Sequence, residues 1–332
     1  MSQTVIKRAR PLKSQLLRLA GPILLVGLLL RLDLDQARAT LQDTKLTLVV
    51  VAATGVFPLI FIKTLRWRNL MRAQNVHVPV RESYLVYFSS LFIGFLTPGR
   101  LGEFVKAIYV ERSCNIPLSR AFSSVLADRL FDFYALLFIG NIALVDFLPS
   151  AQNFTLTLAI LVSLTVPLVF LMHDPSFALI QRIGLMFGRI GRKLFDAQDG
   201  VLPSVRNELR RLSFAELVRA SLLTVIAYTL FYAQGFLLAR ALGITLDFVH
   251  VMFAVALGSL VTLIPISISG LGTRELAIIT YMESFDVQPA HALGFSLLIF
   301  FVFQVAGGTI GALAWWLYPI PIQTPNTLSE SN

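Results

Sequence analysis

The chain breaks its hydrophobic pattern at Gly94-Phe95-Leu96-Thr97-Pro98-Gly99-Arg100-Leu101-Gly102-Glu103-Phe104-Val105-Lys106. The apolar run before this break, residues 84–96, is shorter than the roughly 20 residues with which a helix crosses a bilayer. Pro98 removes a backbone donor, and Gly99 and Gly102 loosen the chain, which predicts a helix break at Thr97-Pro98. A new helix can begin directly afterwards, because proline suits a first helical turn.

Three charged residues follow this break. Arg100, Glu103 and Lys106 recur at intervals of three residues, so they lie near one face of the new helix. Each charge costs about 2.5–3.5 kcal/mol on membrane-insertion scales, and charges at this depth are seldom idle. A broken helix that carries charges is tolerated in a membrane only where it is buried in protein or lines a watery cavity. The pattern therefore predicts a re-entrant hairpin beside a cavity.

A second interruption of the same kind lies near the other end of the chain. The apolar run 255–265 gives way to Pro265-Ile266-Ser267-Ile268-Ser269-Gly270-Leu271-Gly272-Thr273-Arg274-Glu275. Again a proline and two glycines precede an arginine and a glutamate that open a new helix. Two such breaks, one in each half, favour a repeated transporter-like architecture with a central site.

Composition places the chain in the membrane class. Of its 332 residues, 56% are hydrophobic and 14% are charged, whereas soluble domains are about 45–50% apolar and about 25% charged. This predicts an all-α polytopic helical membrane protein. The formal net charge of +9 then indicates cytoplasmic loops and anionic lipid contacts rather than nucleic acid. Cys114 is the single cysteine, which excludes an internal disulfide.

Apolar runs predict six full spans and two re-entrant hairpins, or eight spans if the hairpins cross completely. The spans are expected at residues 16–32, 46–65, 121–147, 154–172, 217–238 and 292–317, with hairpins at 84–110 and 249–285. We interpret this as one membrane domain, 1–318, with halves of about 14–172 and 173–318, followed by a polar tail, 319–332, predicted to be disordered.

Loop charges orient the chain. The region 173–213 is rich in arginine, whereas 146–153 has no Lys or Arg, so the former is expected in the cytoplasm and the latter outside. This places both termini in the cytoplasm and opens the two hairpins to opposite sides, as in an inverted repeat. The same rule assigns the end of the second span to the cytoplasmic side, on the basis of Lys63, Arg66, Arg68 and Arg72. Trp67 is expected at that boundary, as interfacial aromatic residues are.

A basic amphipathic helix is predicted within residues 178–195. Apolar residues recur at helical spacing, and basic residues occupy the other face. Two interpretations stay open: the helix lies on anionic lipid, or it packs on the cytoplasmic face of the bundle. The apolar set is Leu179, Ile183, Met186, Phe187, Ile190 and Leu194, and the basic set is Arg182, Arg189 and Lys193.

The two motifs together resemble a known family. Thr97–Glu103 and Gly270–Glu275, with Asp128-Arg129 between them, are similar to the lysylphosphatidylglycerol synthase transmembrane-region family, also described as the flippase-like domain of multiple-peptide-resistance proteins. The resemblance covers about residues 16–318. It implies movement of lipids across a bacterial or archaeal cell membrane, with two hairpins that meet centrally. The aminoacyl-transferase domain of the synthases is not expected here, which indicates a stand-alone member.

The motif residues suit an anionic group. Each break presents a new helix N-terminus, with free N–H donors and roughly half a positive charge. Arg100 and Arg274 add full charges, and arginine reads phosphate with two donors. Glu103 and Glu275 would hold the arginines, contact a cationic headgroup or carry a coupled proton. Alternatively, each Arg–Glu pair only braces its hairpin.

Other polar residues have two interpretations each. Asp128, Arg129 and Asp132 form either part of a substrate site or a structural ion-pair cluster with Arg100 or Lys106. Asp128 and Asp132 share a helix face, and Arg129 can pair with Asp132. A further set is more typical of interhelical hydrogen bonding than of ligand contact; it consists of Tyr228, Tyr232, Gln234 and Gln304. The predicted substrate-binding set is Arg100, Glu103, Lys106, Asp128, Arg129, Arg274 and Glu275.

Three functions are compatible with these patterns. The first is a transporter of a lipid or lipid-linked precursor, the second a lipid-binding scaffold or regulator of a phospholipid synthase or glycosyltransferase, and the third an intramembrane enzyme on lipid headgroups. The two charged breaks favour the first. We expect no enzyme, metal or cofactor, since the four histidines are scattered without ligand-like spacing. The expected partners are membrane lipids with an anionic headgroup, with a membrane enzyme and oligomer formation left open.

Overall fold

The structure is a computed structural model that describes residues 44–148, 162, 173–186, 188–196, 200–262 and 270–318. The predicted spans at 16–32 and 154–172 fall outside these residues apart from residue 162, as do Pro265 and the tail 319–332. The six-span count, the side on which the termini lie and the division into halves therefore stay predictions.

Every regular element within the described ranges is a helix, and four segments are long and apolar enough to cross a membrane. They coincide with four of the predicted spans, which confirms an all-α polytopic membrane protein. The segments are α3 (Leu46–Thr54) with α4 (Val56–Ala73), α7 (Leu118–Phe147), α12 (Phe214–Ala241), and α15 (Pro289–Ile299) with the π-helix η3 (Phe300–Ala306) and α16 (Gly307–Leu317).

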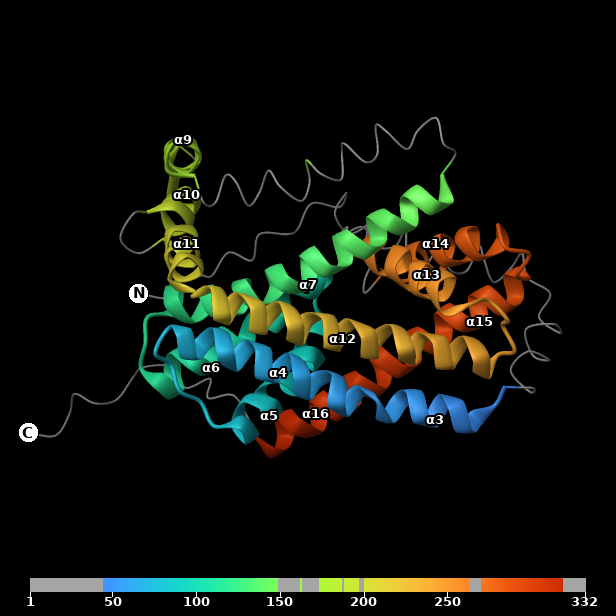
Figure 1. The fold of residues 1–332 in the computed structure, drawn as a ribbon. Coiled ribbons are helices and arrows are strands. Elements are labelled where there is room, and N and C mark those ends of the chain that lie inside the picture. The colour runs from blue at the N-terminus through green and yellow to red at the C-terminus, as the bar shows by residue number, and fades with distance from the viewer. Residues whose placement is uncertain are drawn as a thin grey trace, which may run out of the picture.

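Two shorter hairpins lie between these spans. The first consists of α5 (Val80–Leu96), the 3₁₀ helix η1 (Pro98–Phe104) and α6 (Val105–Cys114). The second consists of α13 (Phe248–Val261) and α14 (Thr273–Glu283). Short connections join the first hairpin to the end of α4 and the start of α7, and the second to the end of α12 and the start of α15. The hairpins therefore enter from opposite ends of the bundle (Figure 1).

The packing follows an inverted arrangement. The span after each hairpin packs on the first helix of the other hairpin: α16 lies against α5, and α7 lies against α13. The spans that precede the hairpins, α4 and α12, pack on each other. Exchanging α4, α5 and α7 for α12, α13 and α16 thus leaves these contacts unchanged, as expected of inverted repeats that enclose a central site.

Local geometry explains the first break. Thr97 is extended, with φ −115° and ψ 140°, because the following proline disfavours helical backbone at the preceding residue. The Thr97 Oγ1 atom accepts a hydrogen bond from the Gly102 N–H at 2.6 Å, which closes the turn. A Cβ atom at residue 102 would lie 2.3 Å from the Ile93 carbonyl oxygen, so η1 can fold back onto α5 only with glycine there.

The second break has a different geometry with the same result. Gly272 has a φ of 83°, a left-handed conformation that glycine adopts without steric cost. Its N–H donates to Glu275 Oε2 at 2.6 Å, so the glutamate caps the first turn of α14. This explains why an acidic residue three positions after the glycine suits the motif.

The two ends of the bundle differ in charge. The end at which α4 stops and α7 starts, called the basic end, carries Arg72, Arg81, Arg112, Arg120 and Arg211, together with Glu82, Glu111 and Glu216. The opposite, acidic end carries Asp146, Asp247, Glu283 and Asp286, together with Lys45 and Arg240. Such asymmetry is what the positive-inside rule expects if the basic end faces the cytoplasm.

Three short helices form a stack at the basic end (Figure 1). They are α9 (Asp174–Leu185), α10 (Gly188–Phe195) and α11 (Val201–Arg211). In this stack α9 packs on α10, α10 on α11, and α11 on the span α7.

Candidate functional site

A cavity of ≈ 330 Å³ lies among the spans and the two hairpins of the bundle. All four described spans and both hairpins contribute to its wall. The lining residues are Val56, Leu59, Ile60, Lys63, Tyr87, Leu91, Phe95, Glu103, Phe104, Arg129, Asp132, Phe133, Leu136, Tyr228, Phe231, Ser259, Thr262, Arg274, Ile299, Phe303, Gln304 and Gly308.

Both sequence motifs reach this cavity. Glu103 comes from η1 in the first hairpin and Arg274 from α14 in the second. The inverted folding of the hairpins thus brings residues that are far apart in sequence to the same space. Of the other predicted site residues, Arg129 also lines the cavity. The side chain of Arg100 lies outside the described part of the structure.

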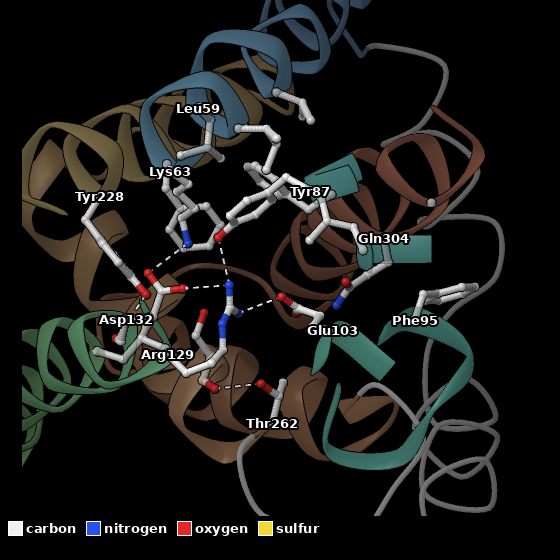
Figure 2. A pocket seen from close by; sticks show the side chains of 18 of the residues that line it. Leu59, Lys63, Tyr87, Phe95, Glu103, Arg129, Asp132, Tyr228, Thr262 and Gln304 are labelled. Atoms are coloured by element: carbon white, nitrogen blue, oxygen red, sulfur yellow. Dashed lines mark hydrogen bonds and ion pairs between the residues drawn. The ribbon is translucent and has the colours of Figure 1, made fainter. Parts of the chain in front are cut away.

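Arg129 is the centre of the charged wall. Its Nη1 atom lies 2.7 Å from Glu103 Oε2, and its Nη2 atom donates to the Tyr87 hydroxyl at 2.7 Å. The same Nη2 atom lies 3.3 Å from Asp132 Oδ2, the pair predicted from their spacing. Figure 2 shows Arg129 between Asp132 and Glu103, with its guanidinium directed toward the Tyr87 hydroxyl. Because Arg129 is held by several acceptors, its position in the cavity wall is fixed.

Behind this wall lies a second layer of charges. Arg66 is 0% exposed, and it donates to Asp128 Oδ1 and Asp132 Oδ1, each at 2.8 Å. Lys63, which lines the cavity, contacts Asp132 Oδ1 at 3.1 Å. Arg66 and Trp67, predicted to lie at the cytoplasmic boundary, are buried between helices, and α4 continues past them to Ala73. The position at which the membrane boundary crosses α4 stays a prediction.

Lys106 belongs to the same layer and does not line the cavity. Its Nζ atom lies 3.3 Å from Asp128 Oδ2. The ammonium group also lies 3.8 Å from the centre of the Tyr87 ring and 5.1 Å from that of Trp67, a cation–π arrangement that compensates burial. Lys106 and Asp128 are therefore supporting residues, as the ion-pair interpretation of the sequence expected.

These residues form one continuous network, named here the α4–α7 network. It contains the cations Lys63, Arg66, Lys106 and Arg129 and the carboxylates Glu103, Asp128 and Asp132. Four positive charges face three negative ones. The described side chains of the network therefore carry one excess positive charge next to the cavity.

The second motif forms a smaller cluster. Arg274 pairs with Glu275, and its Nε atom donates to Ser296 Oγ at 3.2 Å. The guanidinium also lies 5.1 Å from the centre of the Phe300 ring in η3. Glu275 is buried and is used by the helix cap, so it does not line the cavity. Here the arginine faces the cavity while the glutamate braces the hairpin.

The four polar residues predicted to join helices divide into two groups. Tyr228 and Gln304 line the cavity, and the Tyr228 hydroxyl donates to the Asp132 carbonyl at 3.1 Å. Tyr232 and Gln234 are buried and are not among the lining residues. Gln304 lies in the π-helix η3, an irregularity that often marks functional sites.

Residues 15–311 match the family described as "Lysylphosphatidylglycerol synthase TM region". The chain belongs to this family. The match covers both hairpins and all four spans apart from the last residues of α16.

Proteins with sequences similar to this chain include three from archaea. A UPF0104 membrane protein of Methanocaldococcus jannaschii is 22% identical over 317 residues, covering 91% of this chain and 94% of the relative. A UPF0104 membrane protein of Pyrococcus horikoshii is 21% identical over 308 residues, covering 86% and 92%. The glycosyltransferase AglD of Haloferax volcanii is 24% identical over 306 residues, which is 81% of this chain and 48% of that protein.

In this family member, sequence reasoning missed Lys63, Arg66 and Tyr87. A signal was present in the two cations three residues apart at the end of one predicted span and the two carboxylates, Asp128 and Asp132, four residues apart on another. Each spacing puts its pair on one helix face, and the opposite signs match. The boundary interpretation of the arginines concealed this signal.

Proposed function

We propose that this protein moves a lipid or lipid-linked amphiphile between membrane leaflets and holds the anionic headgroup in the central cavity. The observation that supports the proposal most is that Glu103 and Arg274, from two oppositely directed hairpins, line one cavity. Inverted hairpins around a shared site are the arrangement with which many transporters alternate access.

The cavity lining suits an amphiphile. The charged residues that line the cavity include Lys63, Arg129 and Arg274. The apolar residues that line it include Phe95 and Phe231. A volume of ≈ 330 Å³ is near the lower limit of the about 300–1,000 Å³ usual for small-ligand sites. Such a space accommodates a headgroup, and the acyl or prenyl chains would stay in the surrounding lipid.

Charge favours a phosphate over a neutral headgroup. The α4–α7 network has one excess positive charge, and arginine binds phosphate with paired donors. A phosphate at Arg129 would compete with the carboxylate of Glu103, whose ion pair with Arg129 helps to tie η1 to α7. Binding would therefore loosen the first hairpin from the span, and this is the step that we assign to the opening of the site.

Reconstitution tests the proposal directly. Purified protein in liposomes should move fluorescent phosphatidylglycerol between leaflets faster than fluorescent phosphatidylcholine, measured by chemical bleaching of the outer leaflet. Rates for both lipids that equal those of protein-free vesicles would contradict it. Under this proposal the protein carries out no covalent chemistry, and it is not an enzyme.

A second candidate follows from one comparison. The match to AglD covers about half of that glycosyltransferase, so a domain like this one occurs there together with a further region. A lipid-binding scaffold that assists a membrane glycosyltransferase or phospholipid synthase is the corresponding function for this chain. Bound phosphatidylglycerol without movement in liposomes, together with restored movement or synthesis on addition of a partner enzyme, would favour this candidate.

A further inference from the structure

An exposed apolar stripe runs along α9. Leu179 is 57% exposed, Ile183 50% and Met186 84%. Their spacing places them on one face of the helix. Arg182 and, on the neighbouring α10, Arg192 are exposed as well. We name these three apolar residues the α9 stripe.

The opposite side of α9 is fixed to the rest of the stack. Phe177 is buried, and the guanidinium of Arg206 lies 4.4 Å from the centre of its ring. Asp174 contacts Arg210 at 2.9 Å and also pairs with Arg206. Hydrogen bonds from Arg210 and Arg206 lower the pKa of Asp174 below its ordinary value, so the carboxylate stays charged.

Further contacts fix the rotation of α9. The Gln181 amide donates to the Phe195 carbonyl at 2.7 Å, which joins α9 to the end of α10. The contacts of Phe177 and Asp174 act on the same side of the helix. Because these contacts hold the opposite side of α9 against the stack, the α9 stripe points away from the stack.

The stack lies at the level at which the membrane begins. Its last helix, α11, ends at Arg211, and the span α12 starts at Phe214. Phe214, Leu222 and Val225 are exposed apolar residues on this span, as expected of a lipid-facing surface. Figure 1 shows the stack beside the first turns of α12 and α7. The helix α9 thus lies at the end of the bundle at which the exposed apolar surface of α12 starts (Figure 1).

We propose that the stack lies on the membrane surface, with the α9 stripe inserted between lipids and Arg182 and Arg192 against anionic headgroups. A helix with one apolar face and flanking basic residues binds an interface in this manner. Anionic lipid is favoured over zwitterionic lipid because each arginine near a charged leaflet gains electrostatic free energy. This surface is separate from the central cavity, and the inference does not depend on the proposed transport.

A probe in the full-length protein tests this inference. With Cys114→Ser as background, Met186→Cys is labelled with an environment-sensitive fluorophore, and the protein is placed in vesicles of phosphatidylcholine alone or with phosphatidylglycerol. In anionic vesicles, spin-labelled lipid should quench the probe, and aqueous iodide should not. Raising the salt concentration should reduce lipid quenching, since surface attraction is screened.

Charge variants distinguish lipid binding by Arg182 and Arg192 from a general attraction of the basic end to anionic lipid. Arg182→Gln with Arg192→Gln should lower the ratio of docked to undocked stack in anionic vesicles by about five-fold for each arginine. Arg72→Gln with Arg81→Gln removes the same charge from exposed positions at the same end and should leave that ratio unchanged. Circular dichroism and gel filtration check that both variants fold.

Three results would overturn the inference. Iodide could quench the probe in anionic vesicles, which would place the stripe in water. The probe could be shielded from both quenchers, which would show that protein covers the stripe. Lipid quenching could be equal in neutral and anionic vesicles, or equally reduced in both double variants, which would exclude recognition of anionic lipid by Arg182 and Arg192.

Discussion

Glu103 Oε2 lies 2.7 Å from Arg129 Nη1, and this pair ties the tip of the first hairpin to the span α7. Both side chains line the central cavity. The pair therefore has two roles, since it positions η1 and also presents the arginine to a ligand. A headgroup that binds Arg129 must displace or share the carboxylate, and the predictions below depend on this competition.

Replacing Arg129 should reduce transport, both when the substitution removes the charge and when it removes only the planar guanidinium. Arg129→Lys keeps the charge and loses the planar donors, so transport of phosphatidylglycerol should fall about 10-fold or more, as expected when hydrogen bonds to charged groups worth about 1.5–3 kcal/mol are lost. Arg129→Gln should abolish it. Leaflet-resolved rates in proteoliposomes provide the measurement. If Arg129→Lys transports at the parent rate, the paired-donor role is wrong.

The charge balance of the α4–α7 network predicts an order of stabilities. Asp128→Asn leaves two excess positive charges and should lower the free energy of unfolding by about 3–5 kcal/mol, the cost of breaking a buried ion pair. Lys106→Met leaves three cations and three carboxylates, so its cost should be smaller. Thermal unfolding in detergent compares the two variants. A larger loss for Lys106→Met would refute the charge count.

The second break depends on a left-handed glycine. Gly272 has a φ of 83°, so Gly272→Ala should destabilise the protein by about 1–3 kcal/mol through backbone strain. Gly307→Ala is the matched control, because Gly307 has helical backbone and an added Cβ would meet no atom within 4 Å. The control should be neutral or slightly stabilising. Equal losses in both variants would show that strain at Gly272 is not the cause.

Opposite ends of the bundle should be labelled from opposite sides of the membrane. Ser113 and Ser284 are exposed at the basic and acidic ends, and each can become cysteine in a Cys114→Ser background. We expect a membrane-impermeant thiol reagent on intact cells to label Ser284→Cys alone, with Ser113→Cys reacting only after lysis. Labelling of both from outside would contradict the inverted hairpins.

The backbone breaks were more accessible to sequence reasoning than the partners of the side chains. A helix break at Thr97 depends on the proline next to it, and the short hairpins follow from the length of apolar runs. The Glu103–Arg129 pair joins different helices, so it depends on their packing register, which local pattern does not reveal. Arg66 was not predicted as a site residue, because the positive-inside rule counts charges along the chain and does not show which side chains are buried between helices.

The second motif could be predicted from the sequence for a related reason. Its glycines, arginine and glutamate are adjacent in the chain, and the cap that Glu275 provides for Gly272 is a local interaction. The contact of Arg274 with Ser296 joins α14 to α15, and nothing in the spacing of the motif indicates it.

The central claim is that the charged residues of the hairpins and of α7 bind the transported headgroup and do more than brace the fold. Two double variants separate these roles: Arg129→Gln with Glu103→Gln, and Arg274→Gln with Glu275→Gln. Each removes both partners of a pair, so neither changes the net charge of its cluster.

The decisive measurement is the leaflet-resolved rate of phosphatidylglycerol movement in proteoliposomes for these two double variants, with thermal stability measured on the same samples. We expect both variants to fold with melting temperatures near that of the parent and to transport at least about ten-fold more slowly, as lost charge-assisted contacts of about 1.5–3 kcal/mol imply. Parent-like stability combined with parent-like transport in both variants would contradict the account, because it would show that the pairs only brace the hairpins.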